Sequence, residues 1–325
     1  MNKSKIGILL CNIGTPDAPT TKAVRKFLKE FLSDRRVIEL SPLIWQPLLR
    51  TTILPFRPKK LVKLYQKIWT EQGSPLLNYT LDLVEKLKKQ LLTEENEIVI
   101  SVGMRYGNPS IQDSLEEFRK KSVKTLFILP MFPQYSATTT ASTFDSVASA
   151  LKRWRELPEL HMINRYFSHV DYIDAISHSI RSHWDSHGKN YLLFSFHGIP
   201  QKYIQMGDPY ADECHKTSNL IAEKLQLKHD EWSISFQSRL GPTKWLKPYT
   251  DIILRSLPEN GIEHLQVVCP GFSVDCLETL EEISLRGKET FLAAGGKTFS
   301  YIPALNSSDI HISMLAKIIQ SHLSK

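Results

Sequence analysis

A histidine and three carboxylates are the side chains of this sequence whose positions best suit chemistry. His197 ends the apolar run that begins at Tyr191, and Gly198 follows it. The three carboxylates come after a second apolar run, which ends at Cys269: Asp275, Glu278 and Glu282. An imidazole accepts a proton near neutral pH, while carboxylates bind hard or borderline divalent metals and take up released protons. This combination predicts a site that handles both a metal ion and protons.

Each of these residues also has a purely structural interpretation. A histidine at a strand end is often hydrogen-bonded within a turn, and acids are favoured in the first turn of a helix by its dipole. If a helix starts near Asp275, however, the three acids fall at i, i+3 and i+7 and share one face. Such a row favours a path for a metal or for protons, and differs from a closed structural metal site, which needs a tight cluster of ligands.

The elements that would position these residues alternate between apolar strands and amphipathic helices. We expect strands over residues 6–12, 98–106, 125–132, 160–166, 191–197, 233–239, 264–269 and 299–302. We expect helices over residues 21–32, 61–68, 76–92, 110–120, from the turn at 133–142 to 154, and over 172–184, 212–225, 250–257 and 309–323. Repeated βα units without a Gly-x-Gly-x-x-Gly or Walker motif predict an α/β fold of two doubly wound, Rossmann-like lobes, with the ligand in the cleft between them.

Two segments do not fit this regular alternation. Leu40–Pro58 is too rich in proline for a long helix and too apolar for an ordinary loop, which leaves three interpretations: a flexible lip over an apolar ligand, a membrane-surface contact, or a packed irregular connection. Pro133–Ser142 crowds hydroxyl groups at a strand-to-helix turn, where free N–H groups favour an anion, although helix capping explains some of them.

Composition and charge exclude several classes of protein. The 325-residue chain is 42% hydrophobic and 23% charged, has no apolar run long enough for a membrane-spanning helix, and shows no secretory signal, so we expect a cytoplasmic protein. Four cysteines lack metal or redox spacing and are expected to be reduced thiols. Residues 1–60 hold twelve Lys/Arg against four Asp/Glu, which favours an acidic small molecule or an anionic lipid, since no nucleic-acid motif accompanies them.

Five motifs, taken in order, resemble those of the ferrochelatase family, with the strongest likeness to proteobacterial members. They are Asn12–Pro16, Pro133–Ser136, Ser195–Pro200, Gln237–Trp245 and Pro270–Glu282, and the likeness extends from Ile6 to the last helix. The resemblance implies two lobes with four-stranded parallel sheets related by duplication. It also implies a lyase that inserts Fe²⁺ into protoporphyrin IX, releasing two protons, in the last step of haem biosynthesis.

The resemblance also assigns roles to single residues. His197 and Glu278 match the catalytic histidine and glutamate, and both are also expected to contact the metal, as are Asp275 and Glu282 of the acidic path. The expected porphyrin-binding residues are Ile13, Lys67, Arg105, Tyr135, Ser142, Trp245 and Phe272. Which of His197 and Glu278 takes the proton and which positions the metal is left open.

The expected organisation follows from these assignments. Residues 1–168 would form the N-terminal lobe with a porphyrin-binding lip at about 40–58, completed by the helix at 309–325, and residues 169–308 the lobe with His197 and Glu278. We expect no permanently bound cofactor and no [2Fe–2S] cluster, a monomer, and peripheral membrane contact through residues 40–58. The alternatives are a cobalt or nickel chelatase for a more acidic tetrapyrrole, or a non-catalytic haem carrier; protoporphyrin and coproporphyrin are not distinguished.

Overall fold

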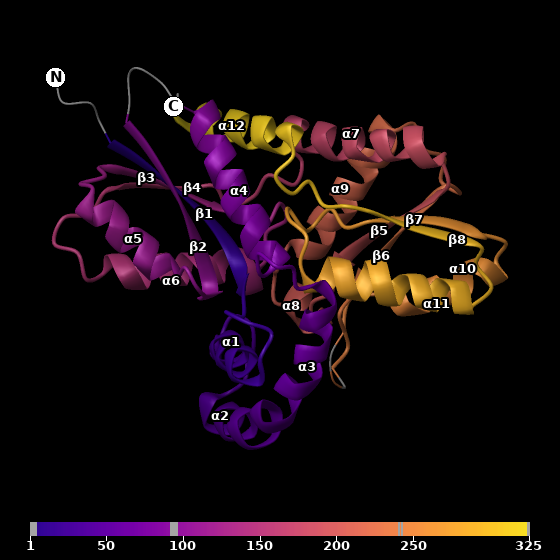
Figure 1. Cartoon of the computed structure of the whole chain (residues 1–325), viewed down its shortest axis with the longest axis horizontal. Coiled ribbons are helices and arrows are strands. Elements are labelled where there is room, and N and C mark those ends of the chain that lie inside the picture. The colour runs from indigo at the N-terminus through magenta and orange to yellow at the C-terminus, as the bar shows by residue number, and fades with distance from the viewer. Residues whose placement is uncertain (1–4, 92–96, 240, 242, 324–325) are drawn as a thin grey trace. The chain divides into compact units, whose positions relative to one another are not determined.

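Strands and helices alternate along the chain in the computed structural model, which describes residues 5–91, 97–239, 241 and 243–323 (Figure 1). The chain divides into two compact units. The first comprises Met1–Phe132, Ser136–Arg165 and Leu315–Lys325, and the second comprises Pro133–Tyr135 and Tyr166–Met314. Each unit holds one four-stranded parallel sheet with helices on its faces, which confirms the predicted fold class.

The first sheet has the strand order β2-β1-β3-β4. Its strands are β1 (Lys5–Thr15), β2 (Glu97–Gly107), β3 (Thr125–Pro130) and β4 (Glu159–Met162). Alternate residues of β1 face opposite sides: Leu9 packs against α5 (Ile111–Lys120) and α6 (Ser142–Leu151), whereas Asn12 meets Thr80 of α4 (Pro75–Gln90). Helices therefore cover both faces, which explains why these strands read as continuous apolar runs.

The second sheet repeats this order as β6-β5-β7-β8. Its strands are β5 (Tyr191–His197), β6 (Trp232–Gln237), β7 (His264–Val268) and β8 (Thr298–Ile302). Its helices are α7 (Val170–His187), α8 (Gln201–Gln205), α9 (Tyr210–Lys224), α10 (Thr250–Glu259) and α11 (Lys288–Ala293). Leu193 and Val267 face a core built with α10 and α11, while Gln266 on the opposite face meets Trp184 of α7.

The strand order fixes where a ligand can bind. In both sheets the first strand lies inside, with the second strand on one side of it and the third on the other. Ligands of open parallel sheets bind outside the carboxyl ends of the two strands at which the order reverses. In the second sheet these are β5, which ends at His197, and β7, which ends just before Cys269. The topology thus brings the two candidate segments to one edge.

Leu40–Pro58 is helical, so the expectation of an irregular segment was wrong. Its elements are α2 (Pro42–Leu48), a π-helical turn (Leu49–Ile53) and α3 (Leu54–Ile68), which follow α1 (Thr21–Ser33). Pro42 lies in the first turn of α2, where a missing N–H costs nothing, and Pro55 lies where the π-helical turn continues into α3. The Trp45 indole N–H donates to the carbonyl of Leu32, 2.6 Å away, and fixes α2 against α1.

The last helix, α12 (Asp309–Leu323), has the bounds expected from its apolar period. Two predicted ends, residue 92 of the helix expected over 76–92 and residues 324–325 of the segment 309–325, lie outside the described residues. No helix in the described part of the chain combines the length and apolarity needed to cross a bilayer.

Candidate active site

His197 is half-buried at the carboxyl end of β5, and its ring has a defined hydrogen bond. Its Nδ1 lies 2.6 Å from the carbonyl oxygen of Gly198. A carbonyl oxygen only accepts, so Nδ1 carries the proton of the neutral ring and Nε2 keeps a free lone pair. Among the described residues Nε2 has no hydrogen-bond partner. This nitrogen is therefore available to a proton or a metal ion.

One aromatic ring lies beside His197 and a second lies beside Gly198. The Phe272 ring centroid is 6.5 Å from that of the imidazole, and Trp245 pairs with Pro200 in a short bridge. Gly198 makes this packing feasible, because a Cβ there would lie 2.9 Å from the carbonyl oxygen of Gln237 and 3.5 Å from the Trp245 indole. The structure thus places Phe272 beside His197, and Trp245 beside the next residue of the chain.

Asp275 lies ahead of the helix, so the expectation that it shares a helical face with the other two acids was wrong. It is 2% exposed, and its carboxylate accepts hydrogen bonds from the Tyr301 hydroxyl at 2.6 Å, the Asn306 amide at 2.7 Å and the Thr279 hydroxyl at 2.8 Å. Three donors satisfy a carboxylate that is shielded from water. Asp275 therefore anchors the first turn of the helix through its hydrogen bond with Thr279.

The helix that carries Glu278 and Glu282 is a π-helix over Glu278–Gly287, not the expected α-helix. π-helical segments are rare and concentrate at functional sites. The Glu282 carboxylate accepts the backbone N–H of Ser238 at 2.8 Å and also the Ser238 hydroxyl, so it holds the loop after β6. Glu278, which is half-buried, opens the helix, and its carbonyl accepts a 2.8 Å hydrogen bond from the Gln237 amide.

The four cysteines are free and buried, as expected. Burial raises the pKa of the Cys276 thiol well above its ordinary value, and the charge of Glu278 adds to this effect. Both effects favour the protonated thiol over the thiolate. The described residues include no group of three or more His, Cys, Asp or Glu side chains placed to hold one metal ion. The metal roles of Asp275, Glu278 and Glu282 stay predictions.

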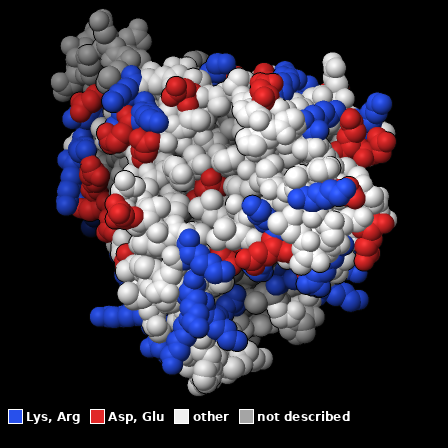
Figure 2. All heavy atoms as spheres, turned by 45° about the vertical axis from the view of Figure 1, so that its right-hand side comes forward, with Lys and Arg blue, Asp and Glu red and all other residues white. Residues whose placement is uncertain are grey.

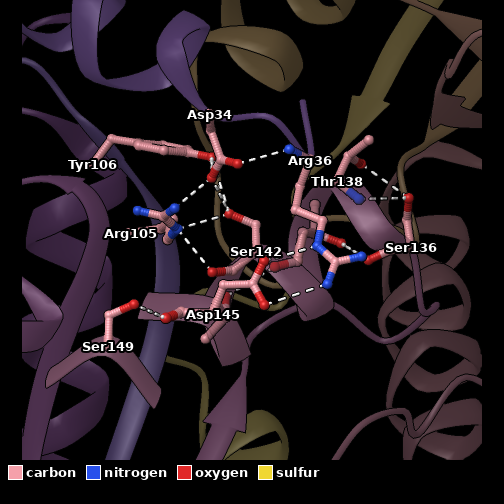
Figure 3. Close-up of polar contacts among 11 residues, drawn as sticks. Asp34, Arg36, Arg105, Tyr106, Ser136, Thr138, Ser142, Asp145 and Ser149 are labelled. Atoms are coloured by element: carbon pink, nitrogen blue, oxygen red, sulfur yellow. Dashed lines mark hydrogen bonds and ion pairs between the residues drawn. The ribbon is translucent and has the colours of Figure 1, made fainter. Parts of the chain in front are cut away.

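In the first unit, Arg105 and Ser142 meet around Asp34, which sequence reasoning missed (Figure 3). Arg105 Nε donates to the Ser142 hydroxyl at 2.7 Å, another Arg105 N–H donates to Asp34, and the Ser142 hydroxyl donates to Asp34 at 2.6 Å. The Tyr106 hydroxyl donates to the same carboxylate at 2.9 Å. Ser142 is fully buried within this cluster, whereas the side chain of Arg105 is 20% exposed.

Burial, the largest influence on Asp34, would raise its pKa. Hydrogen bonds from Ser142 and from the backbone N–H of Arg36, together with the charge of Arg105, outweigh it and lower that pKa. Asp34 is therefore a carboxylate at neutral pH, and its negative charge partly neutralises the positive charge of Arg105. The Arg36 guanidinium pairs with Asp145 at 2.8 Å on the same side (Figure 3).

Three predicted porphyrin residues remain, and Ile13 is the one nearest this cluster along the sheet, since its neighbours Asn12 and Gly14 pair with Met104 and Tyr106 on either side of Arg105. Ile13 is half-buried on β1, Lys67 is exposed in the last turn of α3, and the N–H of Tyr135 donates to Glu213, a buried acid of α9, at 2.7 Å. The hydroxyl-rich turn after β3 is largely satisfied internally: Ser136 caps the turn by accepting from the N–H of Thr138, and the Thr143 hydroxyl donates to the carbonyl of Thr139.

Solved structures of chelatases share this fold. The chain superimposes on "SirB from Bacillus subtilis with Fe3+" with a TM-score of 0.59 at 10% identity, covering 98% of this chain and 95% of that one. It superimposes on CbiX, titled the terminal enzyme for biosynthesis of siroheme in denitrifying bacteria, with a TM-score of 0.50 at 12% identity, covering 98% of both chains. At these identities the likeness establishes the fold of a chelatase.

Sequence similarity defines the family within that class. The family model described as Ferrochelatase matches residues 5–323. Curated ferrochelatases of Aeromonas hydrophila and Shewanella oneidensis are 49% and 48% identical, each over 97% of this chain and over 98% and 95% of their own lengths. The ferrochelatase of Yersinia enterocolitica is 46% identical over the full length of both chains. The chain belongs to the ferrochelatase family, which confirms the resemblance of the five motifs.

Proposed function

We propose that this member of the ferrochelatase family inserts Fe²⁺ into protoporphyrin IX, releasing two protons and forming protohaem, with His197 as proton acceptor and Glu278 as the metal-positioning or proton-relay group. The full-length family match supports the reaction. The observation that carries the residue roles is the hydrogen bond between His197 Nδ1 and the Gly198 carbonyl, because it engages Nδ1 and leaves Nε2 as the ring nitrogen open to a substrate at the switch point of the sheet.

The chemistry of the substrates fits these residues. A planar porphyrin offers its pyrrole lone pairs to iron only when the ring is distorted, so an enzyme that binds the distorted ring more tightly lowers the barrier. Aromatic side chains such as Phe272 and Trp245 suit contact with an apolar ring. Two pyrrole protons must leave as iron enters, and a neutral imidazole is a suitable base for one of them near neutral pH.

The rim groups are proposed to bind the two carboxylates of the porphyrin. Lys67 and Arg105 would supply positive charge and Tyr135 a hydrogen bond, while Ile13 would contact the ring. Because Ser142 is fully buried and bonded to Arg105, we propose that it acts by orienting that guanidinium. We also propose that the two lobes have the boundaries expected from the sequence, residues 1–168 with 309–325 and residues 169–308.

Anaerobic iron insertion into protoporphyrin, followed by absorbance, tests the assignment. We expect His197→Ala and Glu278→Gln each to lower kcat by about a hundredfold or more, since a positioned acid–base group contributes roughly 10²–10⁴. His264→Ala, at an exposed position on the opposite end of the sheet, is the control and should keep wild-type kcat. Full insertion rates in both site variants would contradict the roles, and faster insertion into coproporphyrin than protoporphyrin would contradict the substrate.

We further propose that α2 and the start of α3 rest on an anionic membrane surface while the enzyme remains in the cytoplasm as a monomer. Leu43, Ile44 and Phe56 are 87%, 70% and 67% exposed. Beside them, a cavity of about 400 Å³ is lined by Arg25, Lys29, Arg50, Leu54 and Pro55. Figure 2 shows Lys and Arg gathered over the lower part of the molecule, where Figure 1 places α1–α3. Exposed apolar side chains surrounded by Lys and Arg residues are typical of proteins that bind peripherally to anionic lipid.

Vesicle flotation tests this contact. The wild type should float with phosphatidylglycerol-containing vesicles, less so in high salt, and not with phosphatidylcholine alone. The double variant Leu43→Ser, Ile44→Ser should bind at least about tenfold less. A second double variant, Leu157→Ser and Val170→Ser, removes two apolar side chains that are 62% and 65% exposed elsewhere, and should bind like the wild type. Equal losses in the two variants would contradict the proposed surface.

A further inference from the structure

Gln237, the last residue of β6, is a buried side chain that contacts both segments of the candidate active site. It is 2% exposed. In the sheet it lies opposite His197, and its carbonyl oxygen accepts the N–H of Gly198 at 2.8 Å. Its side-chain amide reaches in the other direction and donates to the carbonyl of Glu278, also at 2.8 Å. One residue therefore joins the backbone beside His197 to the first residue of the π-helix.

The orientation of this amide is fixed from its other end. Gln237 Oε1 accepts from the Ser195 hydroxyl at 2.7 Å and from the Cys269 thiol at 3.6 Å. Burial raises the pKa of Cys269 well above its ordinary value, so the thiol keeps the proton that it donates. Two donors on Oε1 leave Nε2 directed at Glu278, and Gln237 contacts the ends of β5 and β7 as well as the π-helix.

We propose that Gln237 is a positioning residue for iron insertion, which sets the separation of the His197 imidazole and the Glu278 carboxylate without touching either substrate. This inference rests on the proposed function of those two residues. Groups that act on the same metal and the same protons must be held at one distance, and misplacement by about 1 Å can cost roughly a hundredfold in rate. A buried amide bonded on both ends is a rigid spacer of this kind.

The second sheet contains a closely matched control residue. Gln266 of β7 is fully buried, and its Oε1 also accepts two hydrogen bonds, from Trp184 Nε1 at 2.7 Å and from the N–H of Asn190 at 3.2 Å. Its Nε2 likewise donates to a carbonyl, that of Gly188, at 2.9 Å. These contacts lie at the amino-terminal side of the sheet, away from His197. Gln237 and Gln266 therefore share residue type, burial and bonding, and differ in what they hold.

The test compares Gln237→Glu with Gln266→Glu. Each change keeps the accepting oxygen and replaces the donor to a carbonyl with an acceptor, so we expect similar losses of thermal stability. Gln237→Glu should lower kcat for iron insertion by about tenfold to a hundredfold with KM for iron and porphyrin within about twofold, while Gln266→Glu should keep kcat within about twofold. Gln237→Met and Gln266→Met form a second pair if a glutamate prevents folding.

Three outcomes separate the possibilities. A large fall of kcat confined to the Gln237 variants supports the positioning role. Equal falls of kcat at Gln237 and Gln266, or a wild-type kcat at Gln237, would overturn that role while leaving the proposed function intact. A correctly folded wild type that inserts no iron would overturn the proposed function and the inference together.

Discussion

Asn306 and Asp275 bond to each other twice. The Asn306 amide donates to the Asp275 carboxylate at 2.7 Å, and the Asp275 N–H donates to the Asn306 side-chain oxygen at 2.8 Å. Asn306 has a φ of 48°, a left-handed conformation that asparagine tolerates better than most residues. The segment before the π-helix is thus anchored by a residue outside it, and Asp275 is positioned by the residues that follow β8.

The first prediction concerns the hydroxyl that Tyr301 donates to Asp275 at 2.6 Å. Tyr301→Phe removes one donor to a buried carboxylate and should lower the free energy of unfolding by about 1.5–3 kcal/mol, measured by urea denaturation. Tyr191→Phe is the control, because its half-buried ring packs against the same core and its hydroxyl has no partner among the described residues. A loss at Tyr301 no larger than at Tyr191 would show that the carboxylate does not depend on this bond.

The second prediction concerns the acid stability conferred by Asp34. Its pKa in the folded protein lies below the ordinary value of 3.8, so its contribution to stability is complete above that value and is lost as the pH falls through the folded pKa. Asp34→Asn should cost about 3 kcal/mol near neutral pH, and the difference between variant and wild type should shrink as the pH falls below 3.8. Unfolding by urea across this pH range measures the difference.

The control for Asp34 is Asp145, whose ion pair with Arg36 is exposed. Asp145→Asn should change the free energy of unfolding by less than about 1 kcal/mol. A difference between Asp34→Asn and wild type that stays constant into acid would contradict the linkage to the Asp34 carboxyl.

The third prediction concerns His311, a fully buried residue of α12. Burial lowers its pKa to about 4, although its hydrogen bond to the carbonyl of Asn306 acts in the opposite direction. Between about pH 6.5 and 4 the histidine is protonated in the unfolded chain but not in the folded protein. The free energy of unfolding therefore decreases by about 3 kcal/mol as the pH is lowered through this window. His311→Gln should remove that fall, whereas His264→Gln, at an exposed position, should retain it. Parallel pH profiles for His311→Gln and wild type would be the contrary result.

The fourth prediction concerns Gly198. An added Cβ would lie 2.9 Å from a backbone oxygen of Gln237, which cannot move aside as a flexible side chain would. Gly198→Ala should therefore cost about 1–3 kcal/mol of stability and lower iron insertion. At Gly271 the added Cβ would meet only side chains, at 3.3 Å or beyond, so Gly271→Ala should be milder in both assays. Equal behaviour of the two variants would argue against a tight approach at Gly198.

Strand β5 and helix α12 could be predicted to the residue from the sequence, because an apolar run bounded by a histidine and a glycine, or an uninterrupted helical period, leaves little choice. Residues 40–58 were predicted wrongly because their prolines were counted as breaks. Pro42 instead occupies a first-turn position, where proline favours a helix, and Pro55 lies where the π-helical turn meets α3. Pro47 lies at an exposed position within α2, and Pro58 is buried within α3.

The acids of the candidate site were found from their charge, but their geometry was not. Spacing alone assumes an α-helix, so it could not indicate the π-helix or place Asp275 ahead of it. Asp34 and Gln237 were missed for a different reason. An acid near a helix end and an amide at a strand end are common in sequences, and only the fold brings Asp34 to Arg105 or Gln237 to Glu278.

The network behind His197 consists of uncharged groups. Gln237, Ser195, Thr250 and Ser235 link through an amide and three hydroxyls that lie within 3.0 Å of their partners. Charged spacers would impose a permanent field on the imidazole and would respond to every charge that arrives nearby. Dipoles of neutral groups hold the same positions with little net charge, so this network fixes the geometry beside His197 without adding a charge to the carboxylates and substrates that act there.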